Sequence, residues 1–173
     1  MSKAAKFSTT ESLRDGRRVE IRALRHEDRG DLEEAVGRAG VESIRRRFFS
    51  IRRHFSEKEV EFFTNVDFVN HVALAVIAEE RGQPHVLGTG RYIVVEPGRA
   101  EVAFALLDEY QRQGIGAALM RHLAAIARDA GLTEFVAEVL PENTAMLKVF
   151  KKSGLDPITK RAAGVVHVTL KLS

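Results

Sequence analysis

The chain has 173 residues, of which 45% are hydrophobic and 29% charged, a balance typical of one globular domain and not of a disordered segment. It contains no cysteine, which excludes disulfides, thiolate metal sites and cysteine nucleophiles and fits a reducing compartment. Lys and Arg number 27 against 24 Asp and Glu, and the resulting net charge of +3 is too small to identify a polyanion binder.

The N-terminal stretch is polar and ends at a turn signal, Asp15-Gly16. We expect residues 1–16 to form a flexible arm and residues 17–173 to form one domain. The arm lacks the apolar segment of a secretory signal. The longest apolar run, residues 72–78, is far shorter than the roughly 20 residues of a membrane helix. The sequence therefore predicts a soluble, cytoplasmic protein with no membrane partner.

Hydrophobic spacing predicts the elements in chain order. Before residue 70 it indicates a strand at 18–24, helices at 26–39 and 41–49, and a third helix that begins at a capping box of Ser56 and Glu59. After residue 70, alternating or continuous apolar runs predict strands at 72–78, 86–95, 100–107, 135–140 and 165–172. Apolar residues three and four apart predict helices at 116–130 and 143–153, each closed by a glycine. This order indicates a mixed α/β fold.

Two glycines one residue apart, Gly114 and Gly116, open the helix at 116–130 directly after a polar loop. Glycines there let backbone N–H groups converge on an anion, and the helix N-terminus adds partial positive charge, so a phosphate fits. Arg112 can add an ionic contact. The loop lacks the patterns of P-loop and dinucleotide-binding proteins, which disfavours ATP and NAD. Taken alone, these glycines could equally serve only a tight strand-to-helix connection.

The stretch Gln111-x-x-Gly114-x-Gly116, with residues 117–123, resembles the signature motif of the GNAT acyl-CoA N-acetyltransferases. Residues 138–143 and the helix that ends at Gly154 resemble the second motif of that family. The resemblance implies the GNAT fold, a central, mixed and mostly antiparallel β-sheet with splayed parallel central strands, flanked by helices. It also implies acetyl-CoA as the donor.

The resemblance assigns the acetyl-CoA contacts by position. The backbone of Leu106 and Leu107 would bond the pantetheine arm and polarise the thioester, while Asn143 would contact the far side of that arm. Backbone amides would hold the pyrophosphate at Arg112, Gln113, Gly114, Ile115, Gly116, Ala117 and Ala118. Many members have a Tyr as general acid where this chain has Phe150, which cannot donate a proton and would line the arm. A thiolate, with a pKa near about 8.5, can leave without that acid.

Acetyl transfer to a lysine requires a base, because the lysine ammonium has a pKa near about 10.4. Glu101 and Glu138 lie on neighbouring predicted strands and are the candidate general bases. Residues 47–50, 55–59, 66–67 and 71–75 resemble bacterial Pat-type protein lysine acetyltransferases, in which the Glu of an Ala-Glu-x-Ala strand is the base. That Glu is Glu101 here. Glu138 instead matches the base of ribosomal-protein N-terminal acetyltransferases, so the Pat-type resemblance favours Glu101.

The resemblance thus implies acetyl transfer to a protein lysine ε-amine by direct attack in a ternary complex. A small-amine or N-terminal acetyltransferase and a non-catalytic acetyl-CoA-binding regulatory module are the alternatives. The histidines show no metal-ligand spacing, so no metal site is expected, and His71 is interpreted as a structural residue. The arginines at 45–47 and 52–53 are interpreted as a solvated helix face or, second, as a surface for an acidic protein. We do not expect nucleic-acid binding.

Overall fold

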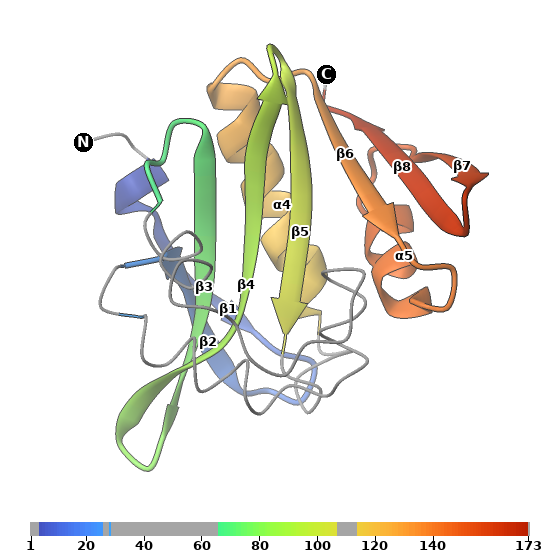
Figure 1. Ribbon diagram of the computed structural model, residues 1–173. Coiled ribbons are helices and arrows are strands. Elements are labelled where there is room, and N and C mark those ends of the chain that lie inside the picture. Colours follow the sequence, from blue (N-terminus) through green and yellow to red (C-terminus); the bar gives the residue numbers. More distant parts are fainter. Residues whose placement is uncertain (1–3, 26–27, 29–65, 107–113, 173) are drawn as a thin grey trace.

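The computed structural model describes residues 4–25, 28, 66–106 and 114–172 (Figure 1). The helices expected at 26–39, at 41–49 and from Ser56 onward lie outside the described residues. The described elements, in chain order, are η1 (Ala4–Lys6), β1 (Ser8–Ser12), β2 (Arg18–Ala23), β3 (His71–Glu80), β4 (Gln83–Glu96), β5 (Arg99–Leu106), α4 (Ile115–Asp129), β6 (Glu134–Val139), α5 (Thr144–Lys151), β7 (Ile158–Ala162) and β8 (Val165–Lys171).

The strands form one eight-stranded sheet in the order β1-β2-β3-β4-β5-β6-β8-β7. Within it, neighbouring strands pair antiparallel except for β5 and β6, which run parallel because α4 returns the chain between them. The mixed, mostly antiparallel sheet with one parallel pair confirms the architecture predicted from the sequence.

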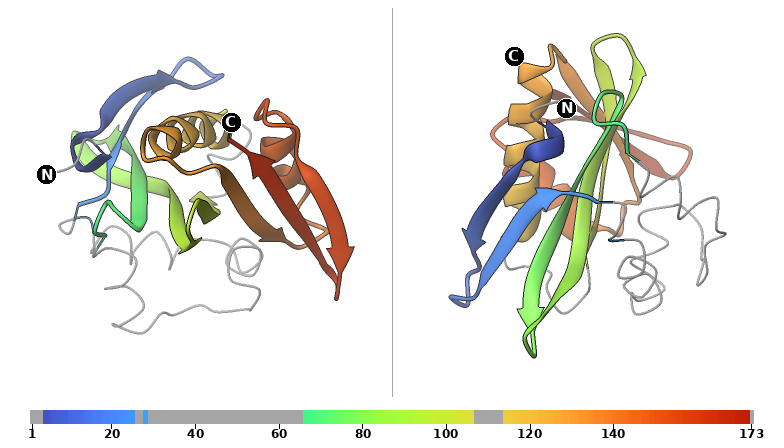
Figure 2. Two further views of the ribbon diagram at one scale, coloured as in Figure 1. Left: turned by 90° about the horizontal axis from the view of Figure 1, so that it is seen from above. Right: turned by 90° about the vertical axis from the view of Figure 1, so that its left-hand side faces the viewer.

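Helices α4 and α5 lie side by side on one face of the sheet (Figure 2). The apolar stripe of α4 is fully buried at Leu119 and Leu123, and α5 contributes Phe150 to the same core. Alternate residues of the strands point toward these helices, for example Val72 and Leu74 of β3. We call this side of the sheet the helix face, and the opposite side the second face.

The second face has its own small apolar cluster around β3. Ala73, Ala75 and Ile77 pack there with Leu24 and with Val86 of β4. Because β3 is covered on both sides, its sequence reads as a continuous apolar run and not as an alternation.

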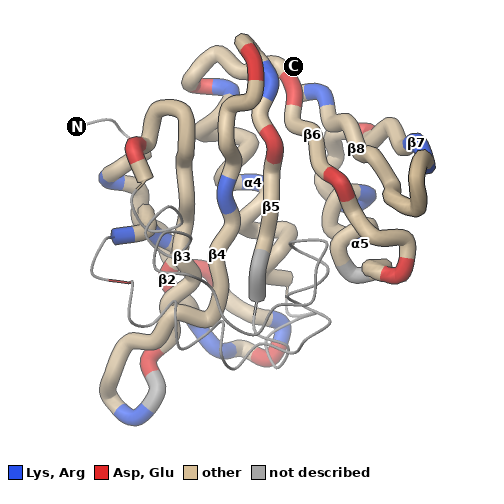
Figure 3. The backbone as a smooth tube through the Cα atoms, viewed as in Figure 1, with Lys and Arg blue, Asp and Glu red and all other residues tan. Residues whose placement is uncertain are grey.

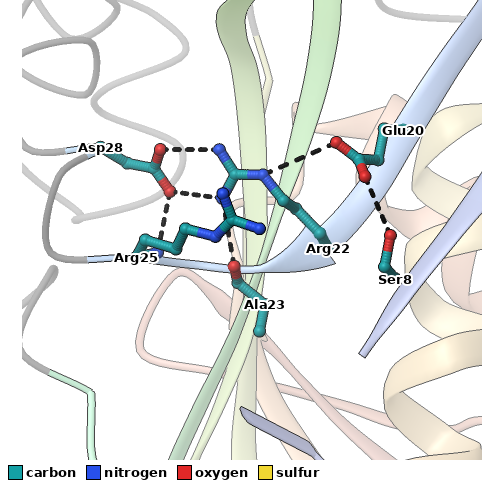
Figure 4. A network of polar contacts seen from close by, with 6 residues as sticks. All are labelled: Ser8, Glu20, Arg22, Ala23, Arg25 and Asp28. Atoms are coloured by element: carbon teal, nitrogen blue, oxygen red, sulfur yellow. Dashed lines mark hydrogen bonds and ion pairs between the residues drawn. The ribbon is translucent and has the colours of Figure 1, made fainter. Parts of the chain in front are cut away.

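A buried ion pair links β2 to the residues that follow it (Figure 4). Arg22 donates from Nη1 and Nη2 to the two carboxylate oxygens of Asp28, each at 2.8 Å, and the same carboxylate accepts the backbone N–H of Arg25 at 2.8 Å. Both side chains are at most 10% exposed. Removing one partner of such a pair leaves an uncompensated buried charge, so the pair fixes the turn that follows β2.

Two strands have no counterpart among the elements predicted from hydrophobic spacing. Within the stretch expected to be an arm, β1 pairs with β2 at the sheet edge, and its polar sequence, Ser-Thr-Thr-Glu-Ser, carries no apolar alternation. At the other edge, β7 is exposed along its whole length and pairs with β8. Edge strands with solvated side chains need little apolar patterning, which explains why the pattern does not reveal them.

Candidate active site

The parallel strands β5 and β6 separate along their length (Figure 1). They pair at only three positions, Arg99 with Glu134, Ala100 with Phe135 and Glu101 with Val136. Beyond Glu101, β5 stays paired with β4 as far as Leu106, while β6 pairs with β8 as far as Val139. The backbone of β5 that faces β6 therefore has no strand partner past Glu101 among the described strands, as the splayed arrangement requires.

Helix α4 begins at the end of the molecule where these strands separate (Figure 1). Its N-cap, Gly114, has φ of 90°, a left-handed conformation that favours glycine, and glycine has no side chain with which to cap the first turn. The first N–H groups of a helix lack intrahelical partners and carry partial positive charge. This terminus therefore has the features that suit a phosphate group, and phosphate binding there stays a prediction.

Gly116 serves a different purpose from Gly114. A Cβ atom at Gly116 would lie 2.9 Å from Cγ2 of Val149, so the absent side chain allows α4 and α5 to approach each other. The sequence pattern indicated anion binding or loop geometry for Gly116, whereas the structure adds helix packing as a third reason. Of the other residues assigned to the pyrophosphate, Ile115 and Ala118 have buried side chains and Ala117 is half-buried.

Asn143 is the N-cap of α5, and its side-chain oxygen accepts the N–H of Met146 at 3.2 Å. This contact caps the first turn of α5, and the contact of Asn143 with the far side of the pantetheine arm stays a prediction. Phe150 is buried, and its ring lies 6.3 Å from that of Phe104 on β5. Phe150 thus packs between α5 and β5, and its role in lining the pantetheine arm stays a prediction.

Three residues assigned to donor binding, Leu107, Arg112 and Gln113, lie outside the described residues. Leu106 is the last residue of β5, and its backbone is paired with Gly88 of β4.

The two candidate bases share the second face. Ala100 and Val102 on β5, like Ala137 and Val139 on β6, belong to the core beneath the helices. Strand alternation therefore turns Glu101 and Glu138 to the opposite side, where both are exposed. Glu101 pairs in register with Val136, two residues before Glu138, so the carboxylates stand on either side of the point of separation. Figure 3 shows acidic positions on both strands.

The acids of β6 have different partners. Glu138 lies 3.6 Å from Nδ1 of His167 on β8, and both side chains are about half exposed. The buried Glu134 contacts Lys171 and Arg99. The hydrogen bond from Lys171, followed by that from Arg99, lowers the pKa of Glu134 although burial opposes the shift. Glu134 is thus held as an ion-paired carboxylate.

Sequence reasoning did not single out Arg91. This residue of β4 is 2% exposed, and its Nη1 lies 3.0 Å from Nε2 of His71. An arginine inside a predicted buried strand is the signal that could have identified it, because arginine is seldom fully buried without a function or a partner. The contact between Glu138 and His167 could not be foreseen, since it depends on the pairing of β6 with β8.

The part of the chain that the structure describes contains no cluster of three or more His, Asp or Glu side chains arranged to hold a metal ion. Over the same residues, no helix is both long and apolar enough to span a membrane.

Comparison with known proteins gives consistent matches. The model of the acetyltransferase (GNAT) family matches residues 38–155. An acetyltransferase of Pseudomonas aeruginosa is 33% identical over 137 residues, which make up 79% of this chain and 74% of that protein. The acetyltransferase Pat of Mycolicibacterium smegmatis is 33% identical over 132 residues, which cover 72% of this chain but 38% of that protein.

Among solved structures, the GNAT domain of S. lividans PAT matches with a TM-score of 0.85 and 35% sequence identity. The match covers 95% of this chain and 96% of that domain. The resemblance therefore extends over the sheet, both described helices and the region where β5 and β6 separate.

Proposed function

The chain belongs to the GNAT acetyltransferase family and has its fold, and from this premise we propose that it transfers an acetyl group from acetyl-CoA to the ε-amine of a protein lysine. The family uses acetyl-CoA, and the similarity to Pat-type proteins supports the protein acceptor. The observation that carries the proposal is the position of Glu101, an exposed carboxylate on the second face at the last residue pair before β5 and β6 separate. We place this activity in the cytoplasm.

The described residues fit an extended anionic donor. The uncapped start of α4 offers backbone N–H groups to a pyrophosphate, and Gly114 leaves open space there, because a Cβ atom at this position would have no neighbouring atom within 4 Å. Beyond Glu101, the edge of β5 that has no strand partner among the described strands offers backbone groups to the amides of the pantetheine arm. Acetyl-CoA, when bound, supplies the thioester whose acyl carbon the amine attacks.

The chemical task of the protein is to take a proton from the acceptor. A lysine ammonium has a pKa near about 10.4, so at neutral pH the amine must lose its proton before it can attack. In this proposal Glu101 accepts that proton, directly or through one water, and the neutral amine then attacks. Phe150 is buried against Phe104 and cannot protonate the leaving thiolate, which is stable enough to leave unassisted.

The experiment is a comparison of Glu101→Gln with Glu138→Gln. The two residues are both exposed carboxylates on the second face, so each substitution is a matched control for the other. Loss of a general base lowers turnover about 100- to 10,000-fold, and we expect this for Glu101→Gln, with acetyl-CoA affinity unchanged by calorimetry. Glu138→Gln should lose less than about tenfold. Full activity in Glu101→Gln with loss in Glu138→Gln would reassign the base to Glu138.

The acceptor is tested separately. Incubating a lysate with the protein and isotope-labelled acetyl-CoA, followed by mass spectrometry, should reveal labelled lysine side chains that are missing with Glu101→Gln. Label found only on polyamines or on protein N-termini would contradict the lysine proposal. Tight acetyl-CoA binding without release of CoA to any acceptor would indicate a binding module instead of an enzyme.

A further inference from the structure

A buried arginine occupies the second face beside Glu101. Arg91 is 2% exposed, and it pairs in register with Ala73 of β3 on one side and Ala103 of β5 on the other. Alanine carries only a methyl group, so the long arginine side chain can lie across its neighbours and reach the next row of residues along the sheet.

That next row consists of His71, Ile93 and Glu101, paired in register across β3, β4 and β5. Arg91 lies two residues from Ile93 on the same strand and therefore on the same face. It is the diagonal neighbour of His71 on one side and of Glu101 on the other. Diagonal neighbours across antiparallel strands are about 7–8 Å apart, within reach of long side chains.

The contact between Arg91 and His71 defines the state of the histidine. A guanidinium group has donors only, so at 3.0 Å its Nη1 donates and Nε2 of His71 accepts. His71 must then be neutral, with its proton on Nδ1, because a protonated ring would place two cations together. The ring is itself buried, and the backbone N–H of His71 donates to Asp67. His71 thus orients the guanidinium.

Charged groups surround Glu101 on this face. On β6, Glu134 and Glu138 are its diagonal neighbours, and like charges disfavour an ionised carboxylate. Glu134 is compensated by Arg99 and Lys171, and Glu138 lies near His167. Among the described residues, the cation on the β4 side of Glu101 is Arg91.

We propose that Arg91, oriented by His71, is a positioning residue whose charge favours the ionised form of Glu101 at the start of the strand separation. This inference rests on the proposed role of Glu101 as the base. Arg91 and Glu101 lie on the second face of neighbouring strands, and a positive charge close to a carboxylate favours its ionised form. Arg91 does not contact the reacting atoms and acts through Glu101.

The test compares Arg91→Gln with Arg91→Lys in the full chain. Glutamine has an amide N–H that can donate to Nε2 of His71, but it lacks the positive charge. Lysine keeps the charge and lacks the planar guanidinium group. Two quantities are measured, the titration midpoint of the Glu101 carboxyl carbon by NMR and the acid limb of kcat/KM against pH. Loss of the cation should raise both by about one pH unit in Arg91→Gln, and by less than half of that in Arg91→Lys.

The matched control is Arg22→Met, which removes another buried arginine that is bound to a different carboxylate, Asp28. It should lower thermal stability and leave the Glu101 midpoint unchanged. A second variant, His71→Asn, keeps Arg91 but removes the acceptor that orients it, and should raise the midpoint by a smaller amount than Arg91→Gln.

A Glu101 midpoint unchanged in both Arg91→Gln and His71→Asn would overturn the inference and leave Arg91 a purely structural residue. The NMR midpoint does not depend on activity, so it separates this inference from the proposed function. If Glu101→Gln is fully active while Arg91→Gln moves the midpoint, the base assignment fails and the electrostatic role of Arg91 stands.

Discussion

The two faces of the sheet are built from alternate residues of the same strands and serve different ends. On β5, Ala100 and Val102 enter the core beneath the helices, while Glu101 between them is exposed on the second face. The helix face is apolar and closely packed around α4, whereas the second face carries the ion pairs of Glu134 and the candidate bases. One-residue alternation thus separates the side chains that stabilise the protein from those proposed to do chemistry.

The largest effect that tests this separation is expected in the core. Leu123 of α4 is fully buried, and Leu123→Ala should lower the free energy of unfolding by about 3 kcal/mol, through lost burial and a residual cavity. Urea denaturation measures the change. The acid limb of kcat/KM should stay where it is, because no charge on the second face has changed.

A matched surface change on the same helix is Arg121→Ala. Its side chain is 61% exposed and pairs with Glu11, so the loss should be below about 1 kcal/mol. Equal losses in Leu123→Ala and Arg121→Ala would contradict the view that the apolar stripe of α4 holds the helix in place.

A smaller effect is expected where the two helices meet. Gly116→Ala places a methyl group 2.9 Å from Val149, and the overpacking should destabilise the protein by about 1–2 kcal/mol even though alanine favours helix. In a thermodynamic cycle, Val149→Ala should relieve this strain, so that the double variant loses less than the sum of the two single variants.

Gly114→Ala is the control for a conformational instead of a packing requirement. No atom lies within 4 Å of a Cβ at Gly114, but its φ of 90° is strained for alanine. Val149→Ala should therefore give Gly114→Ala no relief. If Val149→Ala reduced the destabilisation by Gly114→Ala as much as it reduced that by Gly116→Ala, the distinction between a conformational and a packing requirement would be wrong.

The smallest expected effect concerns a charge on the second face that serves stability. Hydrogen bonds from Lys171 and then Arg99 lower the pKa of Glu134 in the folded protein. Its contribution is therefore present above its unfolded pKa of about 4.3 and is lost as pH falls through the lower folded value. The free energy of unfolding of Glu134→Gln should decline less steeply below about pH 4.3 than that of the unsubstituted protein, as measured by denaturation at several pH values. If the free energy of unfolding had the same pH dependence in both proteins, the ion pairs of Glu134 would make no contribution to stability.

Periodicity and spacing were sufficient for the interior of the fold. The stripe of α4 from Leu119 to Leu123 and the apolar run of β3 each have one physical explanation, burial on one side or on both. The edge strands β1 and β7 could not be predicted, because solvated strands carry no hydrophobic signal.

Some features of the candidate site depend on local structure near a motif, and others depend on strand register. The left-handed conformation of Gly114 and the capping by Asn143 arise within a few residues of each motif. The placing of Arg91 beside His71 requires the pairing of β3 with β4, and the placing of Glu138 near His167 requires that of β6 with β8. Such neighbours become visible only when the sheet is assembled.

The three residue pairs between β5 and β6 have a consequence for the mechanics of the fold. Strands β1 to β5 follow one another in chain order and pair as successive antiparallel neighbours, while β6, β8 and β7 form a second group. Within the described part of the chain, the two groups are joined by this short seam in the sheet, by the ion pair between Arg99 and Glu134, and by the core that α4 and α5 build behind the sheet. In opening motions, the seam is where the sheet has the fewest backbone hydrogen bonds to break. A ligand that forms hydrogen bonds with both strands there would replace the missing backbone hydrogen bonds between β5 and β6. It would thereby join the two groups of strands into one cooperative unit.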